Sequence, residues 1–221
     1  MGWAEKTFAD FRLYAVTDLK AEDAGILRQI EQAYRGGVDI VQLRSKVLSD
    51  AALLRLGLKI RALATLQHKL FFFNDRLDLA LASGAHGVHL GQDDMPVRMA
   101  RRIAAKAGVT LWIGKSTHSL KQALEAQREG ADYIGVGPVF ATPTKPGKCS
   151  VGLSFVQQAA AHVQIPWVAI GGIDLRNIRS VIDSGAKRIA VVRAIFAVKR
   201  TAAAARELKQ QMEGNTYGEN A

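Results

Sequence analysis

The stretch "LFFFNDRLDLALASGAHGVHLGQDD", residues 70–94, shows the repeating unit of this chain. An apolar run at 70–73 is followed by Asn74 and Asp75, and a second run, "HGVHL", is followed by Asp93 and Asp94. Short apolar runs rich in aromatic or β-branched residues are typical of buried strands. The acidic residues therefore come just after two successive strands, and their function depends on how these strands are arranged.

The same unit recurs along the chain. Segments with apolar residues three and four positions apart, which is helical spacing, lie between the apolar runs, for example at 24–37 and 120–131. Alternating strands and helices predict parallel strands with right-handed crossovers. Eight such units in 221 residues favour an α/β fold, a closed (β/α)₈ TIM barrel with eight parallel strands. The expected strands are 12–17, 38–44, 69–74, 86–90, 110–114, 132–137, 167–172 and 188–193.

An open doubly wound sheet is the alternative arrangement. It is disfavoured because the first run is followed by "AVTDLKAEDAG" and not by a G-x-G-x-x-G loop. No Ser/Pro-rich linker divides the chain, so we expect a single domain over residues 1–212. The polar segment 213–221 is expected to be a disordered tail.

Composition excludes several classes of protein. Cys149 is the only cysteine, which rules out an intramolecular disulfide and a cysteine zinc cluster and favours a cytoplasmic location. The start "MGWAEKTFADFR" lacks a secretion signal, and no apolar stretch is long enough to span a membrane. The net charge of +10 is scattered over helical segments without an aromatic-rich basic tract. Nucleic acid and membrane are therefore not expected as partners, and the oligomeric state, including a homo-oligomer, stays open.

In a TIM barrel the chemistry lies at the carboxyl ends of the strands, so the polar residues there should gather on one rim. Two carboxylates without a His or Cys ligand set nearby suit a hard cation such as Mg²⁺. The alternative is that Asp75, and either Asp93 or Asp94, cap the helices that follow. Spacing alone does not separate these two roles.

Other side chains on the expected rim could hold phosphate. Gln42, Arg44 and Lys46 alternate in "QLRSK" and would point the same way in an extended chain, forming a clamp for a di- or triphosphate. The pair Gly171–Gly172 precedes a helix and offers free backbone N–H groups to a phosphate. Hydroxyl and amino groups are added after the fifth and sixth strands by Ser116, Thr142, Thr144 and Lys145.

The histidines are weaker candidates. Ser116 and His118 have no acidic partner at the spacing of a catalytic triad. His86 and His89 flank a strand and are expected to be packed or to face solvent.

Seven motifs in order make the chain resemble the thiamine phosphate synthase family, which also includes a thiazole tautomerase. They cover about Leu13 to Ile195 and read "VTD", "GGVDIVQLRSK", "NDRLDLAL", "GVHLGQDDMP", "IGKSTH", "GADYIGVGPVFATPTK" and "VAIGGI". The resemblance implies a transferase that joins 4-amino-5-hydroxymethyl-2-methylpyrimidine pyrophosphate to hydroxyethylthiazole phosphate. The products would be thiamine phosphate and pyrophosphate, and the implied cofactor is Mg²⁺.

The resemblance also implies roles for individual residues. Asp75 and Asp94 would bind the metal, and Gln42, Arg44, Lys46, Asn74 and Lys145 would hold the pyrimidine pyrophosphate. Ser116 would contact the pyrimidine or the leaving group, so that Lys145, Ser116 and Arg44 are the catalytic candidates. Thr142, Thr144 and Gly172 would bind the thiazole phosphate.

Three residues depart from the family pattern. Arg193 stands where a small residue is common and would strengthen or crowd the thiazole-phosphate site, whereas Lys115 and His86 are expected to face away from the substrates. The tautomerase, which could use His118 as a proton carrier, and a phosphate-binding barrel without catalysis are the rival functions. The pyrophosphate clamp favours the synthase over the first, and two rim carboxylates argue against the second because they repel phosphate in the absence of a metal.

Overall fold

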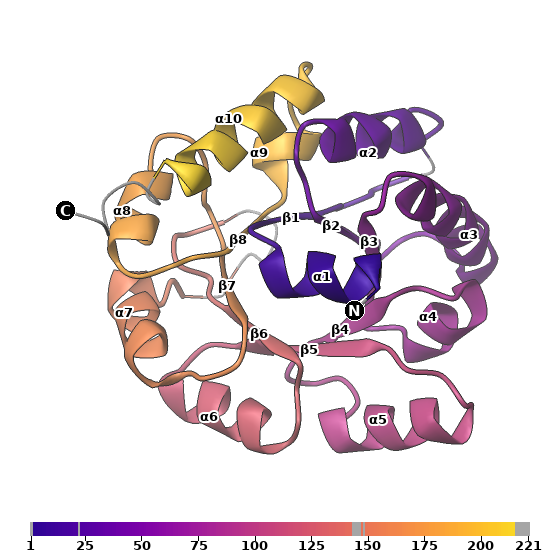
Figure 1. Cartoon of the computed structure of the whole chain (residues 1–221), viewed down its shortest axis with the longest axis horizontal. Coiled ribbons are helices and arrows are strands. Elements are labelled where there is room, and N and C mark those ends of the chain that lie inside the picture. Colours follow the sequence, from indigo (N-terminus) through magenta and orange to yellow (C-terminus); the bar gives the residue numbers. More distant parts are fainter. Residues whose placement is uncertain (1, 22, 143–146, 148, 215–221) are drawn as a thin grey trace.

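The computed structural model describes residues 2–21, 23–142, 147 and 149–214. Eight parallel strands follow one another around a closed barrel in chain order, and the eighth pairs with the first (Figure 1). This confirms the predicted TIM barrel, and closure excludes the open sheet. The strands are β1 Leu13–Val16, β2 Ile40–Leu43, β3 Leu70–Asn74, β4 Gly87–Leu90, β5 Trp112–Thr117, β6 Tyr133–Val136, β7 Trp167–Ile170 and β8 Ile189–Val191.

Most of the helices form a ring outside the barrel (Figure 1). In α2 the buried residues Ile26, Ile30, Ala33 and Tyr34 recur at helical spacing and form one apolar face. The helices after β1 are α2 Ile26–Arg35, α3 Asp50–Leu66, α4 Leu77–Ser83, α5 Val97–Lys106, α6 Leu120–Arg128, α7 Gly152–His162, α8 Ile178–Asp183, α9 Arg193–Phe196 and α10 Thr201–Glu213. None of the helices described is long and apolar enough to cross a membrane.

A helix that the sequence did not predict, α1 Trp3–Asp10, lies across the barrel at its amino-terminal end (Figure 1). Its Phe8 ring stacks on Trp112, the first residue of β5, with 4.5 Å between ring centroids. Phe8 also faces Phe72 and Tyr133 inside the barrel and is only 9% exposed. Helix α1 therefore covers the end of the barrel opposite the carboxyl ends of the strands.

Strand β5 is longer than predicted. It was expected to end at Gly114, but it continues to Thr117, and Lys115, Ser116 and Thr117 pair in register with β6. Ser116 therefore lies within the strand and does not follow it. At the other end of the chain, α10 includes Glu213, and residues 215–221 lie outside the described residues, so the tail stays a prediction.

Candidate active site

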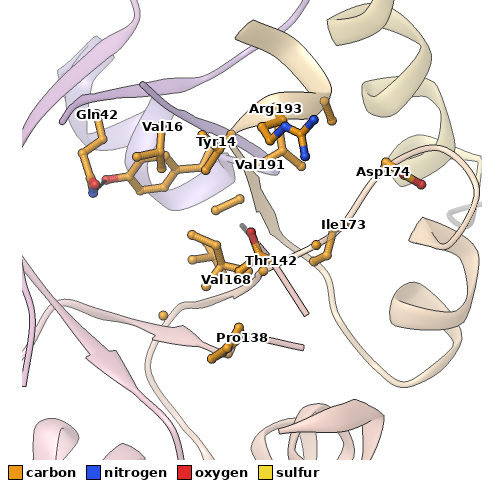
Figure 2. A pocket seen from close by; sticks show the side chains of 18 of the residues that line it. Tyr14, Val16, Gln42, Pro138, Thr142, Val168, Ile173, Asp174, Val191 and Arg193 are labelled. Carbon is orange, nitrogen blue, oxygen red and sulfur yellow. Dashed lines mark hydrogen bonds between the residues drawn. The ribbon is translucent and has the colours of Figure 1, made fainter. Parts of the chain in front are cut away.

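A cavity of about 700 Å³ opens at the carboxyl ends of the strands. Figure 2 shows Tyr14 and Gln42 on one side of it, with Pro138 and Val168 across from them. Every strand of the barrel contributes to its lining, through Tyr14, Gln42, Asn74, His89, Ser116, Gly135, Val168 and Ala190. The cavity lies where the sequence placed the chemistry of the barrel.

A chain of hydrogen bonds crosses the interior of the barrel beneath the cavity. Gln42 donates its side-chain N–H to the Tyr14 hydroxyl at 2.8 Å, and the hydroxyls of Tyr14 and Tyr133 are 2.9 Å apart. His89 joins the chain onward, with Nδ1 2.9 Å from the Tyr133 hydroxyl and Nε2 2.9 Å from Oγ of Ser116. Burial raises the pKa of both tyrosines well above the usual value, so both hydroxyls stay neutral. The chain thus orients the His89 ring and the Ser116 hydroxyl at the cavity.

Arg44 is the buried cation of the site, with 6% of its surface exposed. Its guanidinium forms an ion pair with Asp18, which also binds Lys20 at 2.9 Å. The Thr17 hydroxyl accepts the backbone N–H of Arg44 at 2.8 Å and donates to its carbonyl at 3.0 Å. The segment after β1 therefore holds Arg44 at the cavity wall.

Lys46 does not line the same cavity as Gln42 and Arg44. It lines a neighbouring cavity of about 330 Å³ together with Asp75, and Asn74 lines both cavities. The predicted alternation holds for Gln42 and Arg44 and fails at Lys46, because the chain still pairs with the segment after β1 at Ser45 and bends at residues 46–48. The three side chains of the predicted clamp are consequently divided between two adjoining cavities.

The two predicted metal ligands, Asp75 and Asp94, lie together. Burial and the adjacent Asp94 carboxylate raise the pKa of Asp75 to about 6. One oxygen of Asp94 accepts the backbone N–H of Gly91 at 2.6 Å. None of Asp75, Asp93 and Asp94 caps a helix, because the N-cap residues of α4 and α5 are Arg76 and Pro96. The capping alternative is therefore wrong.

Two carboxylates are a small donor set for a metal. The described part of the chain holds no group of three or more His, Cys, Asp or Glu side chains that could bind one. Mg²⁺ commonly uses one or two carboxylates and takes its other ligands from water and substrate phosphates. The facing oxygens of Asp75 and Asp94 fit that pattern, and their mutual repulsion is what a cation would relieve.

A glycine turn follows β7 on the opposite side of the cavity. Gly171 and Gly172 have φ of 106° and 66°, and a Cβ on Gly172 would lie 2.7 Å from the carbonyl oxygen of Ala141. Only glycine is accommodated there without strain. The Asn177 side chain donates to the Gly172 carbonyl at 2.8 Å and holds the turn. Thr142 lines the same cavity from the segment after β6.

Arg193 is the first residue of α9, one residue beyond the end of β8, and its exposed side chain lines the cavity. Figure 2 shows it across an opening from Asp174, which follows the glycine turn. The structure thus brings Arg193 to the cavity wall. An effect of this residue on a phosphate site, as expected from the sequence, needs that position. Thr144 and Lys145 lie outside the described residues, so their roles stay predictions.

Residues 13–195 match the sequence profile of the family described as thiamine monophosphate synthase. That match covers more than half of the chain. The chain belongs to the thiamine monophosphate synthase family. This confirms the resemblance to the family that the seven motifs indicated.

Individual relatives agree with the family. The chain is 49% identical over 185 residues to a thiamine-phosphate synthase of Nostoc sp., covering 84% of this chain and 51% of the relative. It is 48% identical over 189 residues to the thiamine-phosphate synthase of Thermus thermophilus, covering 85% and 89%. A solved thiamine phosphate pyrophosphorylase from Pyrococcus furiosus superposes with a TM-score of 0.84 at 37% identity, covering 95% of this chain and 98% of that one. The chain spans about half the length of the cyanobacterial relatives it matches.

Sequence reasoning missed part of this candidate site. His89 was expected to be packed or solvent-facing, but both of its ring nitrogens take part in the interior chain. Tyr14 and Tyr133 were not singled out at all. Alternation in "LYAVT" and "HGVHL" places Tyr14 and His89 on the inner face of the barrel, which was the available signal.

Of the remaining candidates, Lys115 and His86 do not line the main cavity, whereas His118 does. Lys115 is buried and donates to the Gly91 carbonyl at 2.6 Å, away from the residues that line the main cavity. His86 accepts the backbone N–H of Phe71, and burial lowers its pKa to about 4. His118 lines the cavity, and its Nδ1 contacts the Gly137 carbonyl, so the ring is held by the backbone.

Proposed function

We propose that this chain is a Mg²⁺-dependent, cytoplasmic transferase that makes thiamine phosphate. It joins 4-amino-5-hydroxymethyl-2-methylpyrimidine pyrophosphate to hydroxyethylthiazole phosphate and releases pyrophosphate. The observation that carries the proposal is the carboxylate pair Asp75–Asp94 beside a cavity lined by Arg44 and Asn74. Family membership gives the substrates their names.

The pyrimidine pyrophosphate would lie toward β2, β3 and β5. Arg44, already positioned by Asp18, and Lys46 would neutralise the leaving pyrophosphate, with Lys145 as a third cation. Asn74 lies between the two cavities and can bind both parts of this substrate. Asp75 and Asp94 would hold Mg²⁺, which supplies charge neutralisation to the pyrophosphate oxygens.

The thiazole phosphate would lie toward β6, β7 and β8. Backbone N–H groups of the Gly171–Gly172 turn, the Thr142 and Thr144 hydroxyls, and Arg193 would bind its phosphate. The C–O bond to pyrophosphate then breaks, and the thiazole nitrogen attacks the resulting pyrimidine cation. The site's contribution is positioning and electrostatics, with Ser116 oriented by His89 toward the pyrimidine or the leaving group.

The test is to incubate the protein with both phosphorylated substrates, with Mg²⁺ or with EDTA, and to measure thiamine phosphate and pyrophosphate. Equal amounts of both products, formed only with Mg²⁺, are expected. A parallel incubation with the thiazole substrate alone tests the tautomerase, which needs no pyrimidine. Isomerisation of that substrate, without thiamine phosphate in the first assay, would overturn the proposal.

A further inference from the structure

The backbone at Asp75 has an unusual conformation. Its φ is 60°, which residues other than glycine rarely adopt. The N–H of Arg76 donates to the Asn74 carbonyl at 2.7 Å, closing a three-residue turn with Asp75 at its centre. The N–H of Asp75 donates to the His89 carbonyl at 2.8 Å. This turn directs the Asp75 carboxylate to Asp94, although two like charges resist that approach.

The next residue along the chain is held on two sides. The Arg76 guanidinium binds both oxygens of Asp50, one of them through Nη2 at 2.9 Å. It also binds both oxygens of Asp78, through Nε at 2.9 Å and Nη2 at 2.6 Å. Asp50 is the first residue of α3, and Asp78 lies in the first turn of α4. One guanidinium therefore ties the turn to two helices.

We infer that Arg76 is a positioning residue, which holds Asp75 in the orientation that binds the metal through its two-sided contact with Asp50 and Asp78. This rests on the proposed function only in taking Asp75 as a metal ligand. The ion pairs are too exposed to add much stability, since the Asp50 and Asp78 side chains are 66% and 64% exposed. The two bidentate contacts do restrict the position of Arg76 and, with it, the backbone of the preceding residue. Such a restriction is needed because the turn at Asp75 is strained and the two carboxylates repel each other.

The experiment measures Mn²⁺, a paramagnetic substitute for Mg²⁺, binding to the substrate-free protein by electron paramagnetic resonance. Arg76→Ala should raise the Mn²⁺ dissociation constant about 10- to 100-fold, the usual effect of losing a group that orients a metal ligand. Asp50→Asn should give a smaller increase in the same direction, and Asp50→Glu should restore the affinity. Arg179→Ala is the matched control because it removes an ion pair of similar exposure, Arg179–Asp183, on α8.

A second readout separates positioning from loss of fold. Thiamine phosphate synthesis by Arg76→Ala should recover when the Mg²⁺ concentration is raised, with circular dichroism unchanged. If Arg76→Ala does not fold, Asp50→Asn decides the question. Wild-type Mn²⁺ affinity in the folded variants would overturn the inference, and so would an absence of Mn²⁺ binding to the wild-type protein. In that last case the assay with both substrates still decides the proposed function separately.

Discussion

Asp75 is the residue at which function and stability conflict most directly. Its pKa in the folded protein is about 6 against an ordinary value of 3.8, so the folded state favours the protonated carboxyl. The protonated Asp75 carboxyl therefore stabilises the folded state at low pH. This stabilisation is lost as the pH rises from about 4 to about 6 and the carboxyl ionises. At neutral pH the ionised, half-buried carboxylate destabilises the metal-free protein.

We expect Asp75→Asn to stabilise the metal-free protein by about 1 kcal/mol at about pH 7.5, a figure reduced to allow for solvent screening at this half-buried site. Near pH 4 the variant and the wild type should have the same stability. Urea denaturation in EDTA at both pH values measures the difference. Added Mg²⁺ should stabilise only the wild type. A variant that is equally stable to wild type at both pH values would show that the Asp75–Asp94 pair is not strained.

Arg193 tests whether a departure from the family pattern alters the substrate site. In the described part of the chain its guanidinium forms no ion pair with a carboxylate, and it lines the cavity near the glycine turn. Loss of a charge-assisted hydrogen bond to phosphate costs about 1.5 to 3 kcal/mol, so Arg193→Ser should weaken thiazole-phosphate binding roughly ten- to a hundredfold. Calorimetric titration of each substrate measures this. The pyrimidine pyrophosphate serves as the control, and unchanged affinity for both would show that the side chain points outward.

At the scale of elements, the sequence predicts the positions of the strands better than the contacts between their inward-facing side chains. All eight strands follow from apolar runs and turn signals, and barrel closure follows from their alternation with helices. The chain from Gln42 to Ser116 does not follow, because it joins side chains of β1, β2, β4, β5 and β6 across the barrel. Alternation shows which residues point inward but not which of them meet. Ser116 was placed after β5 because the polar run "KST" is not typical of a strand.

Helix α1 was missed for a related reason: it is not part of a strand–helix repeat. Its role is to cover the amino-terminal end of the barrel with Phe8, which packs on Trp112, Phe72 and Tyr133. Phe8→Ala should lower the free energy of unfolding by about 3 kcal/mol. The melting temperature should then fall by roughly 10 °C for a chain of this size, as measured by differential scanning calorimetry.

The matched variant Phe8→Leu should lose much less stability, because it keeps most of the apolar volume. Synthesis of thiamine phosphate at about 25 °C should be unchanged in both, since the cavity opens at the other end of the barrel. A large loss of activity in folded Phe8→Ala protein would show that α1 influences the site through Tyr133.

At the scale of the whole molecule, the interior hydrogen-bond chain and the cations occupy different depths of the site. The interior chain of Tyr14, Tyr133 and His89 lies inside the barrel, whereas the cations Arg44, Lys46 and Arg193 lie beyond the strand ends. The protein also carries a net charge of +10. The proposed phosphorylated substrates would therefore be attracted to the open end of the barrel by the molecule as a whole as well as by individual contacts.

We expect this attraction to appear as a dependence on salt. Raising KCl from about 20 to about 200 mM shortens the screening length to less than 10 Å, so the KM of both substrates should rise roughly threefold or more. Turnover at saturation should change little, because contacts within the occupied site are screened less than those at the surface. Steady-state kinetics over a KCl series measures both quantities. The unphosphorylated thiazole alcohol, which is uncharged, is the control ligand, and its affinity should not depend on salt. If its binding weakened in parallel with that of the phosphate, the salt would be acting on the protein's conformation, and the basic surface would have no part in drawing substrates to the site.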